Sequence, residues 1–287
     1  ENKVVVITGG SSGIGKAAAI KIAEAGAKVV IAARGEEELE VTRKEITDAG
    51  YLCYAYKSDL ADLASCDDLI EQVVKDHGGI DILINNAGRS IRRSIELSFD
   101  RFHDFERTMQ LNYFGSLRLI MKSLPGMISN RRGHIINISS IGVLASSPRF
   151  SAYVASKAAL DAFSHCAQGE LSGKGISFTT INMPLVKTPM IAPTKMYDSV
   201  PTLTPEEAAD LIVKAIIEKP SRVATRLGVF AGVMHAVFPK AYEVVISTAF
   251  DLFPDSAAAK GMKGRGDMGQ ATSEQIAFAS VMRGVHW

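Results

Sequence analysis

The chain has 287 residues, of which 47% are apolar and 22% charged, and its formal net charge at pH 7 is +1. This length buries a large core in one α/β domain or in two smaller ones, and the composition excludes a disordered chain. The near-zero net charge excludes a general attraction for nucleic acid or anionic lipid, so any recognition by charge must be local.

The cysteines and histidines predict neither a disulfide framework nor a metal site. Cys53, Cys66 and Cys166 are widely spaced, and the histidines show no ligand spacing. A reducing, cytoplasmic setting is therefore expected. The sequence has no secretory segment and no uninterrupted apolar run of about 18 residues. It begins at Glu1 without a methionine, which fits either a processed start or a domain cut from a longer polypeptide.

Apolar runs rich in β-branched residues alternate with helical patterns over the first 226 residues. The predicted strands are nearly continuous in apolar residues, as in a parallel sheet covered on both faces. They span residues 3–8, 28–33, 52–57, 80–85, 134–139, 176–182 and 222–226. The helical windows between and after them are 14–25, 36–49, 62–76, 100–123, 153–171 and 205–218. This alternation predicts a Rossmann-type, doubly wound α/β fold with about seven parallel strands and helices on both faces.

The pattern changes after residue 226. Residues 227–255 carry two apolar helical faces separated by Pro239, which predict extra C-terminal helices of the same domain. Two interpretations are open for these helices: they cap the core or form an oligomer contact, or they cover a long-chain substrate. Weak contact with a membrane surface is a further expectation. Residues 256–287 are predicted to be a flexible linker and a terminal segment.

The segment TGGSSGIG at residues 8–15 crowds four glycines between the first strand and the first helix. A glycine-rich turn at that place brings the backbone close to a ligand and directs helix N–H groups at an anion, although such turns also occur for steric reasons alone. The glycine spacing is G-x3-G-x-G, and the predicted contacts with a dinucleotide are Gly9, Ser11, Ser12, Gly13, Ile14 and Gly15.

The end of the second predicted strand discriminates between the two nicotinamide dinucleotides. An acid there would hydrogen-bond the adenosine ribose hydroxyls and repel a 2′-phosphate. This chain has Ala32-Ala33-Arg34 instead, and a guanidinium can pair with a phosphate dianion. The sequence therefore favours NADPH over NADH, with Ser12 as an additional donor. The alternative is that Arg34 is an ordinary surface arginine.

A later strand ends at Ser139-Ser140 and is followed by a loop and a helix that carries Tyr153 and Lys157. The i, i+4 spacing puts the tyrosine and the lysine on one helical face. A tyrosine with an ordinary pKa of about 10 is a poor acid–base group at neutral pH, and a nearby ammonium favours its phenolate. Beside a dinucleotide site, the pair indicates proton transfer.

These motifs together resemble the short-chain dehydrogenase/reductase superfamily. TGGSSGIG (8–15), NNAG (85–88), the asparagine of LNYFG (Asn112), Ser140 thirteen residues before the tyrosine, and YVASK (153–157) occur in the order typical of that superfamily. The resemblance covers residues 3–226. It implies that residues 1–226 are an NADP-binding reductase core in which Tyr153 protonates the carbonyl oxygen during reduction.

The same resemblance implies roles for the neighbouring residues. Ser140 would hydrogen-bond the developing oxyanion, and Lys157 would bind the nicotinamide ribose and lower the pKa of Tyr153. Asn112 would hold the water of a proton relay. Ser139 competes with Ser140, but adjacent strand residues face opposite sides and the superfamily spacing matches Ser140. The adenosine side of the cofactor would meet Asp59, Leu60, Asn86, Ala87 and Gly88.

One segment departs from the pattern of the superfamily. A Pro-Gly pair usually follows the sixth strand, with a threonine near the cofactor beyond it. This chain has MPLVKTPM, with Pro184-Leu185 and a shorter interval to Thr188. Pro184, Val186 and Thr188 are still expected to meet the nicotinamide carboxamide and the phosphates.

The stretches NMPLVKTPMIAPTKMYDSVPTLTPEEAA, FPDSAAAKG and MRGVHW resemble a narrower group, the C-terminal reductase domain of bacterial two-domain fatty acyl-CoA reductases. This resemblance implies a long-chain acyl-CoA or fatty aldehyde substrate, NADPH as reductant, and fusion to an N-terminal reductase domain in the full-length protein. The site suits reduction of an aldehyde to an alcohol, and also reduction of a thioester. Arg89, Arg92 and Arg93 are expected near its mouth, where they grip coenzyme A phosphates or form a solvated basic loop.

Two other functions stay open at this point. One is a general short-chain carbonyl reductase or hydroxy-lipid dehydrogenase, and the other is a non-catalytic module that senses NADPH. The superfamily resemblance also implies a homo-oligomer, with dimer contacts through the helices predicted at 100–123 and 153–171.

Overall fold

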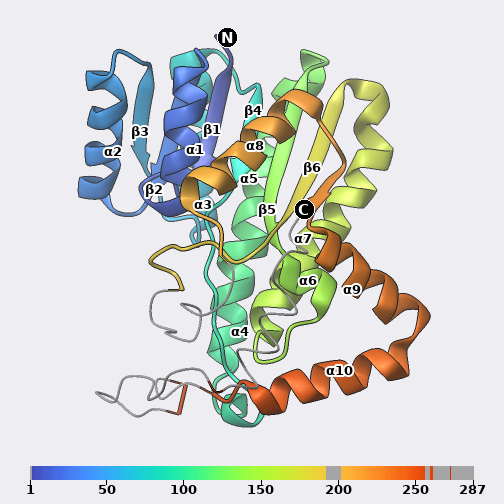
Figure 1. The fold of residues 1–287 in the computed structure, drawn as a ribbon. Coiled ribbons are helices and arrows are strands. Elements are labelled where there is room, and N and C mark those ends of the chain that lie inside the picture. Colours follow the sequence, from blue (N-terminus) through green and yellow to red (C-terminus); the bar gives the residue numbers. More distant parts are fainter. Residues whose placement is uncertain (1, 192–201, 256–258, 261–271, 273–287) are drawn as a thin grey trace.

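Seven parallel strands form one sheet at the centre of the fold (Figure 1). The computed structural model describes residues 2–191, 202–255, 259–260 and 272. The strands lie in the order β3-β2-β1-β4-β5-β6-β7, which confirms the predicted parallel α/β sheet. Their bounds are β1 (Val4–Thr8), β2 (Lys28–Ala33), β3 (Cys53–Lys57), β4 (Ile82–Asn85), β5 (Gly133–Ser140), β6 (Ile176–Met183) and β7 (Arg222–Ala224).

Helices cover both faces of this sheet, and alternate residues of one strand supply the two cores. Val5 and Ile7 pack with one set of helices, whereas Val4 and Val6 pack with the other, because side chains of a strand alternate between its faces. The first set is α1 (Gly13–Glu24), α2 (Glu36–Asp48) and α8 (Pro205–Glu218). The second set is α3 (Leu63–His77), α5 (Ser116–Ser129) and α7 (Ser151–Leu171).

The single helix predicted over 100–123 is interrupted. It consists of α4 (Phe102–Met109), a π-helical turn η2 (Gln110–Gly115), and α5, which continues through Pro125. A Cβ on Gly115 would lie 2.1 Å from the carbonyl oxygen of Leu60. The glycine therefore allows the turn to press against the segment that follows β3. Turns of this type inside α-helices are frequent at functional sites. Single-turn 3₁₀ helices occur at η1 (Glu96–Ser98) and η3 (Ser172–Lys174).

The strand order places a switch point between β1 and β4. β2 and β3 lie on one side of β1, and β4 to β7 lie on the other. Open α/β sheets bind ligands in the crevice outside the carboxyl ends of the strands at such a point. The segments that follow β1, β4, β5 and β6 all leave the sheet at this edge, and they carry most of the predicted site residues.

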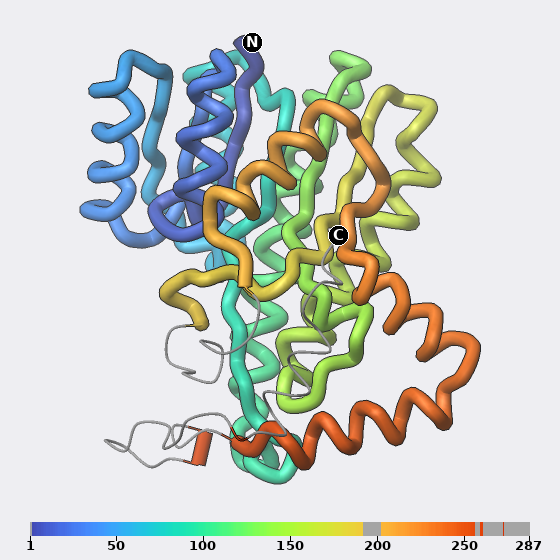
Figure 2. Tube along the Cα trace, in the orientation of Figure 1, coloured from blue at the N-terminus to red at the C-terminus, as the bar shows by residue number. Residues whose placement is uncertain are grey.

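Two C-terminal helices, α9 (Arg226–Val237) and α10 (Pro239–Leu252), follow β7; with residues 253–255 they are called the C-terminal arm. Figure 2 shows that the arm turns away from the sheet and passes beyond α6 (Ile141–Ala145). Gly228 of α9 packs closely on Ile141 of α6, and the Tyr242 hydroxyl of α10 donates to the Ala145 carbonyl at 2.7 Å. Over the described residues, no helix is long and apolar enough to cross a membrane.

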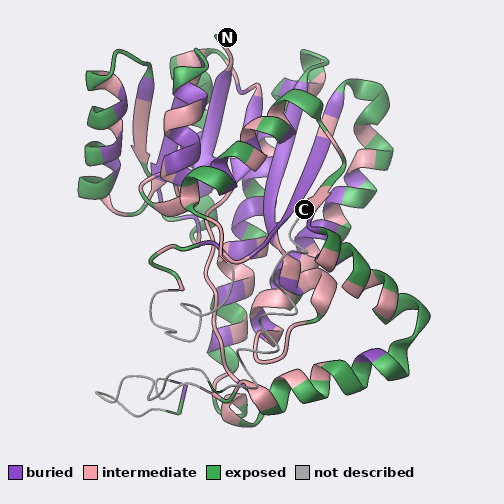
Figure 3. Ribbon diagram, in the orientation of Figure 1, coloured by how far each residue is buried: buried purple, intermediate pink, exposed green. Residues whose placement is uncertain are grey.

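Much of the arm is exposed despite its apolar character (Figure 3). The arm packs on α6 rather than on the sheet, and the two interpretations of these helices stay predictions. Its exposed apolar side chains are Val229, Phe230, Val233, Val237, Phe238, Val244, Val245 and Phe250.

A buried ion pair fixes the far end of the arm. Arg149 Nε lies 3.2 Å from Asp255 Oδ2, and the two side chains are only 7% and 9% exposed. The Ser94 amide donates to Asp255 Oδ1 at 3.0 Å, and the Arg149 guanidinium lies 3.8 Å from the centre of the Phe250 ring. Burial alone disfavours the charged Asp255, yet the hydrogen bonds from Ser94 and the charge of Arg149 lower its pKa. These contacts, called the Asp255 latch, tie the arm to the segments after β4 and before α7.

Substitution Asp255→Ala should release the arm. It leaves the Arg149 charge buried and unpaired, which typically costs about 3–5 kcal/mol. We expect trypsin cleavage after Lys240, at the start of α10, to become at least about tenfold faster because local opening becomes more frequent. Mass spectrometry of timed digests measures this rate. Glu243→Ala, which removes an exposed carboxylate from the same helix, is the matched control. Equal cleavage of the two variants would contradict the assignment of the latch.

Candidate active site

The glycine turn lies between β1 and α1 at the switch point. Gly9 and Gly13 have positive φ angles of +66° and +51°, and a Cβ on Gly15 would lie 2.2 Å from the Gly9 carbonyl oxygen. Only glycine fits such a crossing of backbone on backbone. Ser12 is the N-cap of α1, but its exposed hydroxyl makes no capping hydrogen bond. The first turn of α1 thus presents backbone N–H groups and a hydroxyl where an anion binds well.

The end of β4 holds this turn in place. The amides of Asn86 and Ala87 donate to the Thr8 hydroxyl at 2.9 and 3.0 Å, and the Asn86 side-chain amide donates to the Thr8 carbonyl at 3.0 Å. Asn86 and Ala87 were expected along the adenosine. Asn86 lies at that edge, but its side chain is occupied in holding the glycine turn.

Arg34 directly follows β2 and is exposed. No described carboxylate forms an ion pair with it, whereas nearby Lys57 pairs with Glu36 at 3.1 Å. Asp59 and Leu60 follow β3 at the same edge of the sheet. Asp59 Oδ1 accepts a hydrogen bond from the Ala61 amide at 3.1 Å, and Leu60 is buried. The guanidinium of Arg34 is thus left available for an anionic ligand.

Ser140, Tyr153 and Lys157 come together at the carboxyl end of β5. Ser140 is the N-cap of α6 and accepts a hydrogen bond from the Gly142 amide at 3.0 Å. Its hydroxyl also hydrogen-bonds the Tyr153 phenol. Lys157 Nζ donates to the Ile138 carbonyl at 2.7 Å, and its side chain is buried. Ser139 Oγ instead accepts from Asn182 Nδ2 of β6 at 3.4 Å, so Ser140 is the serine that contacts the tyrosine.

Burial has the largest effect on the pKa values of Tyr153 and Lys157. It raises the pKa of the Tyr153 phenol above its ordinary value, against the effect of the hydrogen bond with Ser140. The direction is opposite to the lowering that was expected from Lys157, because removal of the phenolate from water outweighs the favourable contacts. Burial also lowers the pKa of Lys157 to about 8. Tyr153 therefore stays protonated at neutral pH.

Asn112 lies in the π-helical turn η2 and is fully buried. Its Oδ1 accepts from the Arg89 amide at 2.8 Å, and its Nδ2 donates to the Arg89 carbonyl and to Ser156 Oγ, both at 2.9 Å. Both hydrogens of the Asn112 side-chain amide thus bind protein groups and connect the segment after β4 to α7. The relay water expected at Asn112 stays a prediction.

Gly88 completes the edge beside this group. A Cβ there would lie 3.3 Å from Asn112 Oδ1 and 3.4 Å from Lys157 Nζ. The NNAG segment therefore touches the cluster of Ser140, Tyr153 and Lys157 as well as the glycine turn.

The unusual loop after β6 also returns to the glycine turn. Val186 is buried and pairs with Leu203 in an isolated parallel bridge that uses the Leu185 carbonyl and the Lys187 amide. In such a bridge the amide and carbonyl of Val186 itself point to the other side. The side chain of Thr188 lies 3.2 Å from where a Cβ on Gly13 would be. Pro184 leads into the loop, and residues 192–201 lie outside the described residues.

The basic residues after NNAG have protein partners. Arg92 Nη2 donates to the carbonyls of Phe253 and Pro254 at 2.9 and 2.8 Å, and Arg93 Nη1 donates to the Ala259 carbonyl at 3.3 Å. These two arginines bind the C-terminal segment, which neither the coenzyme A interpretation nor the solvated-loop interpretation anticipated.

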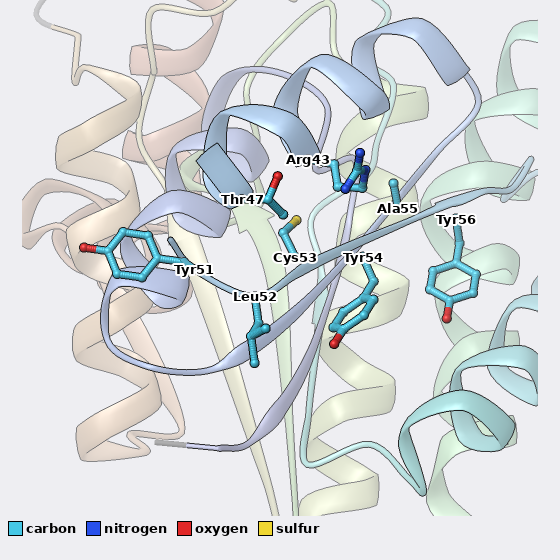
Figure 4. Close-up of a pocket in the computed structure, with 8 residues that line it drawn as sticks. All are labelled: Arg43, Thr47, Tyr51, Leu52, Cys53, Tyr54, Ala55 and Tyr56. Carbon is cyan, nitrogen blue, oxygen red and sulfur yellow. The ribbon is translucent and has the colours of Figure 1, made fainter. Parts of the chain in front are cut away.

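A surface pocket at the edge strand β3 contains none of the predicted site residues (Figure 4). It lies between the end of α2 and the amino-terminal part of β3, and its lining consists of Arg43, Thr47, Tyr51, Leu52, Cys53, Tyr54, Ala55 and Tyr56. The predicted site residues therefore lie at the carboxyl edge of the sheet and not at this pocket.

A glycine turn at the switch point of a parallel sheet, with a tyrosine and a lysine beside it, defines a class of protein, the dehydrogenases built on a dinucleotide-binding fold. A family model described as short chain dehydrogenase matches residues 3–197. The chain belongs to the short-chain dehydrogenase family and is an oxidoreductase.

Individual relatives agree with this membership. A fatty acyl-CoA reductase of Acinetobacter baylyi is 53% identical over 287 residues, which is 100% of this chain and 96% of that protein. A single-residue variant of the actinorhodin polyketide ketoreductase, solved with NADPH, superposes with a TM-score of 0.70 at 28% identity, over 75% of this chain and 90% of that one. The 3-ketoacyl-(acyl-carrier-protein) reductase of Brucella melitensis, complexed with NADH, gives 0.69 at 29% identity, over 75% and 90%.

Substitution Gly15→Ala should damage the glycine turn. Its methyl group would overlap the Gly9 carbonyl, and relief of such an overlap costs about 1–3 kcal/mol. We expect a lower Tm in calorimetry together with a loss of nucleotide binding. Gly169→Ala is the control, because a Cβ at that position in α7 has no neighbour within 4 Å and alanine favours a helix. A Gly15→Ala protein as stable as Gly169→Ala would refute the steric argument.

Proposed function

We propose that this chain is an NADPH-dependent reductase of long-chain lipid carbonyls that acts in the reduction of a fatty acyl-CoA to an aldehyde or an alcohol. The observation that carries the proposal is the group of Ser140, Tyr153 and buried Lys157 next to the glycine turn. The substrate class is supported by the 53% identity to a fatty acyl-CoA reductase, a likeness that spans the whole chain.

The site fits a nicotinamide dinucleotide. The glycine turn has no side chain at Gly9, Gly13 or Gly15, and at the start of α1 the Ser12 hydroxyl makes no capping hydrogen bond, so this turn can receive an anionic phosphate. Gly9, Ser11, Ser12 and Ile14 would hold the phosphates, while Asp59, Leu60 and Ala87 would contact the adenosine. Val186 offers its main chain to the carboxamide, and Lys157 would bind the nicotinamide ribose. When bound, the reduced cofactor supplies the hydride.

The phosphorylated form of the cofactor is favoured by Arg34. Its guanidinium is exposed and without a carboxylate partner among the described residues, and the Ser12 hydroxyl lies free at the start of α1. The glutamates of the first turn of α2 are adjacent, but Glu36 is paired with Lys57. A phosphate between a free guanidinium and a helix N-terminus is stabilised by both.

The reduction needs a proton at the carbonyl oxygen as hydride reaches the carbon. Tyr153 Oη gives that proton, and the Ser140 hydroxyl donates a hydrogen bond to the same oxygen as negative charge develops. The ammonium of Lys157 stabilises the phenolate that remains. The relay water held by Asn112 returns a proton to this phenolate. With a thioester, the same proton reaches the hemithioacetal oxygen before the thiolate leaves.

Arg34→Asp should reverse the preference for cofactor. An aspartate repels the 2′-phosphate and can accept from the ribose hydroxyls of NADH. We expect the Kd for NADPH to rise about a hundredfold, an effect of about 2.7 kcal/mol, while the Kd for NADH changes little or falls. Fluorescence titration of both nucleotides measures this. Arg43→Asp makes the same charge change at a half-exposed residue of α2 that lines the pocket beside β3, and is the control. An unchanged Kd for NADPH would exclude the 2′-phosphate role of Arg34.

Tyr153→Phe should abolish reduction without loss of the cofactor site. It removes the proton donor, and general acid catalysis of this kind contributes about 10²–10⁴-fold. Decanal and palmitoyl-CoA are offered separately with NADPH, and NADPH oxidation and products are followed. Turnover of either by the parent, lost in Tyr153→Phe at an unchanged Kd for NADPH, supports a reductase.

The products show which hydride step the chain performs. If the parent binds NADPH but oxidises it with neither substrate, the proposal fails in favour of a sensing module. Turnover of short ketones alone would favour a general carbonyl reductase.

A further inference from the structure

Asp161 is a buried carboxyl group beside the reaction centre that the proposed mechanism leaves without a role. Tyr153, Lys157 and Asp161 follow one another at intervals of four residues in α7, so the three side chains share one face of the helix. Lys157 is 3% exposed and Asp161 is 6% exposed. An ionisable group is rarely withdrawn from water to this extent unless other groups compensate for its charge.

Hydrogen bonds connect Asp161 to the strand that carries the catalytic serine. Asn182 Nδ2, from β6, lies 3.2 Å from Asp161 Oδ2 and 3.3 Å from the Ser140 carbonyl, and can donate to both. The Ser139 hydroxyl also hydrogen-bonds this carboxyl group. Asp161 Oδ1 is buried with no hydrogen-bond partner among the described residues. An apolar residue would avoid the desolvation of this oxygen, so packing alone does not explain an aspartate here.

The electrostatic effect of Asp161 reaches both reactive side chains. Burial lowers the pKa of Lys157 to about 8, and the negative charge of Asp161 opposes that fall. The same charge adds to the effect of burial in raising the pKa of Tyr153. Burial raises the pKa of Asp161 itself, whereas hydrogen bonds from Ser139 and Asn182 and the charges of Arg222 and Lys157 favour the ionised carboxylate. The negative charge of Asp161 therefore favours the protonated forms of Tyr153 and Lys157.

We propose that Asp161 is a positioning residue of the active site. Its buried carboxylate keeps Lys157 protonated at the pH at which the enzyme works, and through Asn182 it holds the end of β5 that carries Ser140. This inference rests on the proposed function, which assigns Lys157 and Ser140 to the reaction. Asp161 lies one helical turn from Lys157, and its negative charge attracts the Lys157 ammonium. A neutral side chain in its place removes this attraction, so Lys157 loses its proton at a lower pH.

The test is a direct titration of Lys157 in the full chain without added nucleotide. The protein is labelled with ¹³C-lysine, and the signal of Lys157 is assigned by its absence from Lys157→Arg. In Asp161→Asn we expect the midpoint of its Cε titration to fall by about one pH unit, since an opposite charge this close shifts a pKa by about that amount. In Asp161→Glu, which retains the charge, we expect a smaller change. An unchanged midpoint in Asp161→Asn overturns the proposal.

Two further variants separate charge from structure. Ser164→Ala removes a buried hydrogen bond with Asn137 from the same helix and should leave the Lys157 midpoint in place. If Asp161→Asn does not fold, Asp161→Ser is the second neutral variant, because its smaller side chain leaves room for a water molecule. A midpoint that moves equally in Ser164→Ala would reduce the effect to loosened packing and overturn the proposal.

The pH profile of turnover gives a second readout. The alkaline limb of kcat/KM for decanal reduction should move to lower pH in Asp161→Asn by the shift seen in the titration, because Lys157 and Tyr153 both lose their protons earlier. The titration needs no substrate. A chain that reduces neither decanal nor palmitoyl-CoA therefore refutes the proposed function without deciding the role of Asp161, which the Lys157 midpoint decides by itself.

Discussion

The site depends on one close approach of backbone to backbone. The chain leaving β1 lies directly against the chain leaving β4: the Thr8 hydroxyl accepts from two successive amides, and a Cβ on Gly9 would lie 3.1 Å from the Ala87 Cα. Because this crossing is so close, the first turn of α1 and the NNAG segment share one edge of the sheet. Gly88 then meets Lys157 and Asn112 at that edge. A side chain at the crossing would separate the nucleotide half of the site from its catalytic half.

The catalytic half combines burial with very few compensating charges. Lys157 and Tyr153 are both withdrawn from water, and burial shifts the pKa of each toward its neutral form. A raised pKa keeps the Tyr153 phenol protonated, which suits a proton donor. A lowered pKa makes the Lys157 ammonium lose its proton more easily. Burial thus favours the protonated form of Tyr153 but not that of Lys157. The nearby carboxylate of Asp161 favours the protonated form of both. An acidic residue at this place is therefore compatible with the proton transfer that we propose for Tyr153.

Periodicity and motif spacing were sufficient to predict the sheet, because continuous apolar runs and capped helices are local properties. The seven strands start and end within two residues of their expected bounds, and α8 begins at the predicted Pro205. The π-helical turn was not predictable in the same way, since Gln110–Gly115 has ordinary helical composition and its shape depends on the contact of Gly115 with Leu60. Likewise, the i+4 spacing from Lys157 was visible for Asp161, but its bond to Asn182 needs the pairing of β5 with β6. The carbonyl groups that accept hydrogen bonds from Arg92 and Arg93 lie more than 150 residues further along the chain, beyond the reach of local patterns. The roles of the individual site residues stay predictions.

The Asp255 latch also sets an order of events during synthesis and folding. It joins Ser94 to a residue 161 positions later and Arg149 to the same residue. The ribosome therefore completes the glycine turn and α7, the helix of Tyr153, well before it adds the residue that closes the latch. Contacts at such long sequence separation form late, since the loop between them must first be closed. A nascent chain can thus acquire its nucleotide-binding edge early, whereas the segments flanking the catalytic residues gain their last support only as the C-terminal arm emerges.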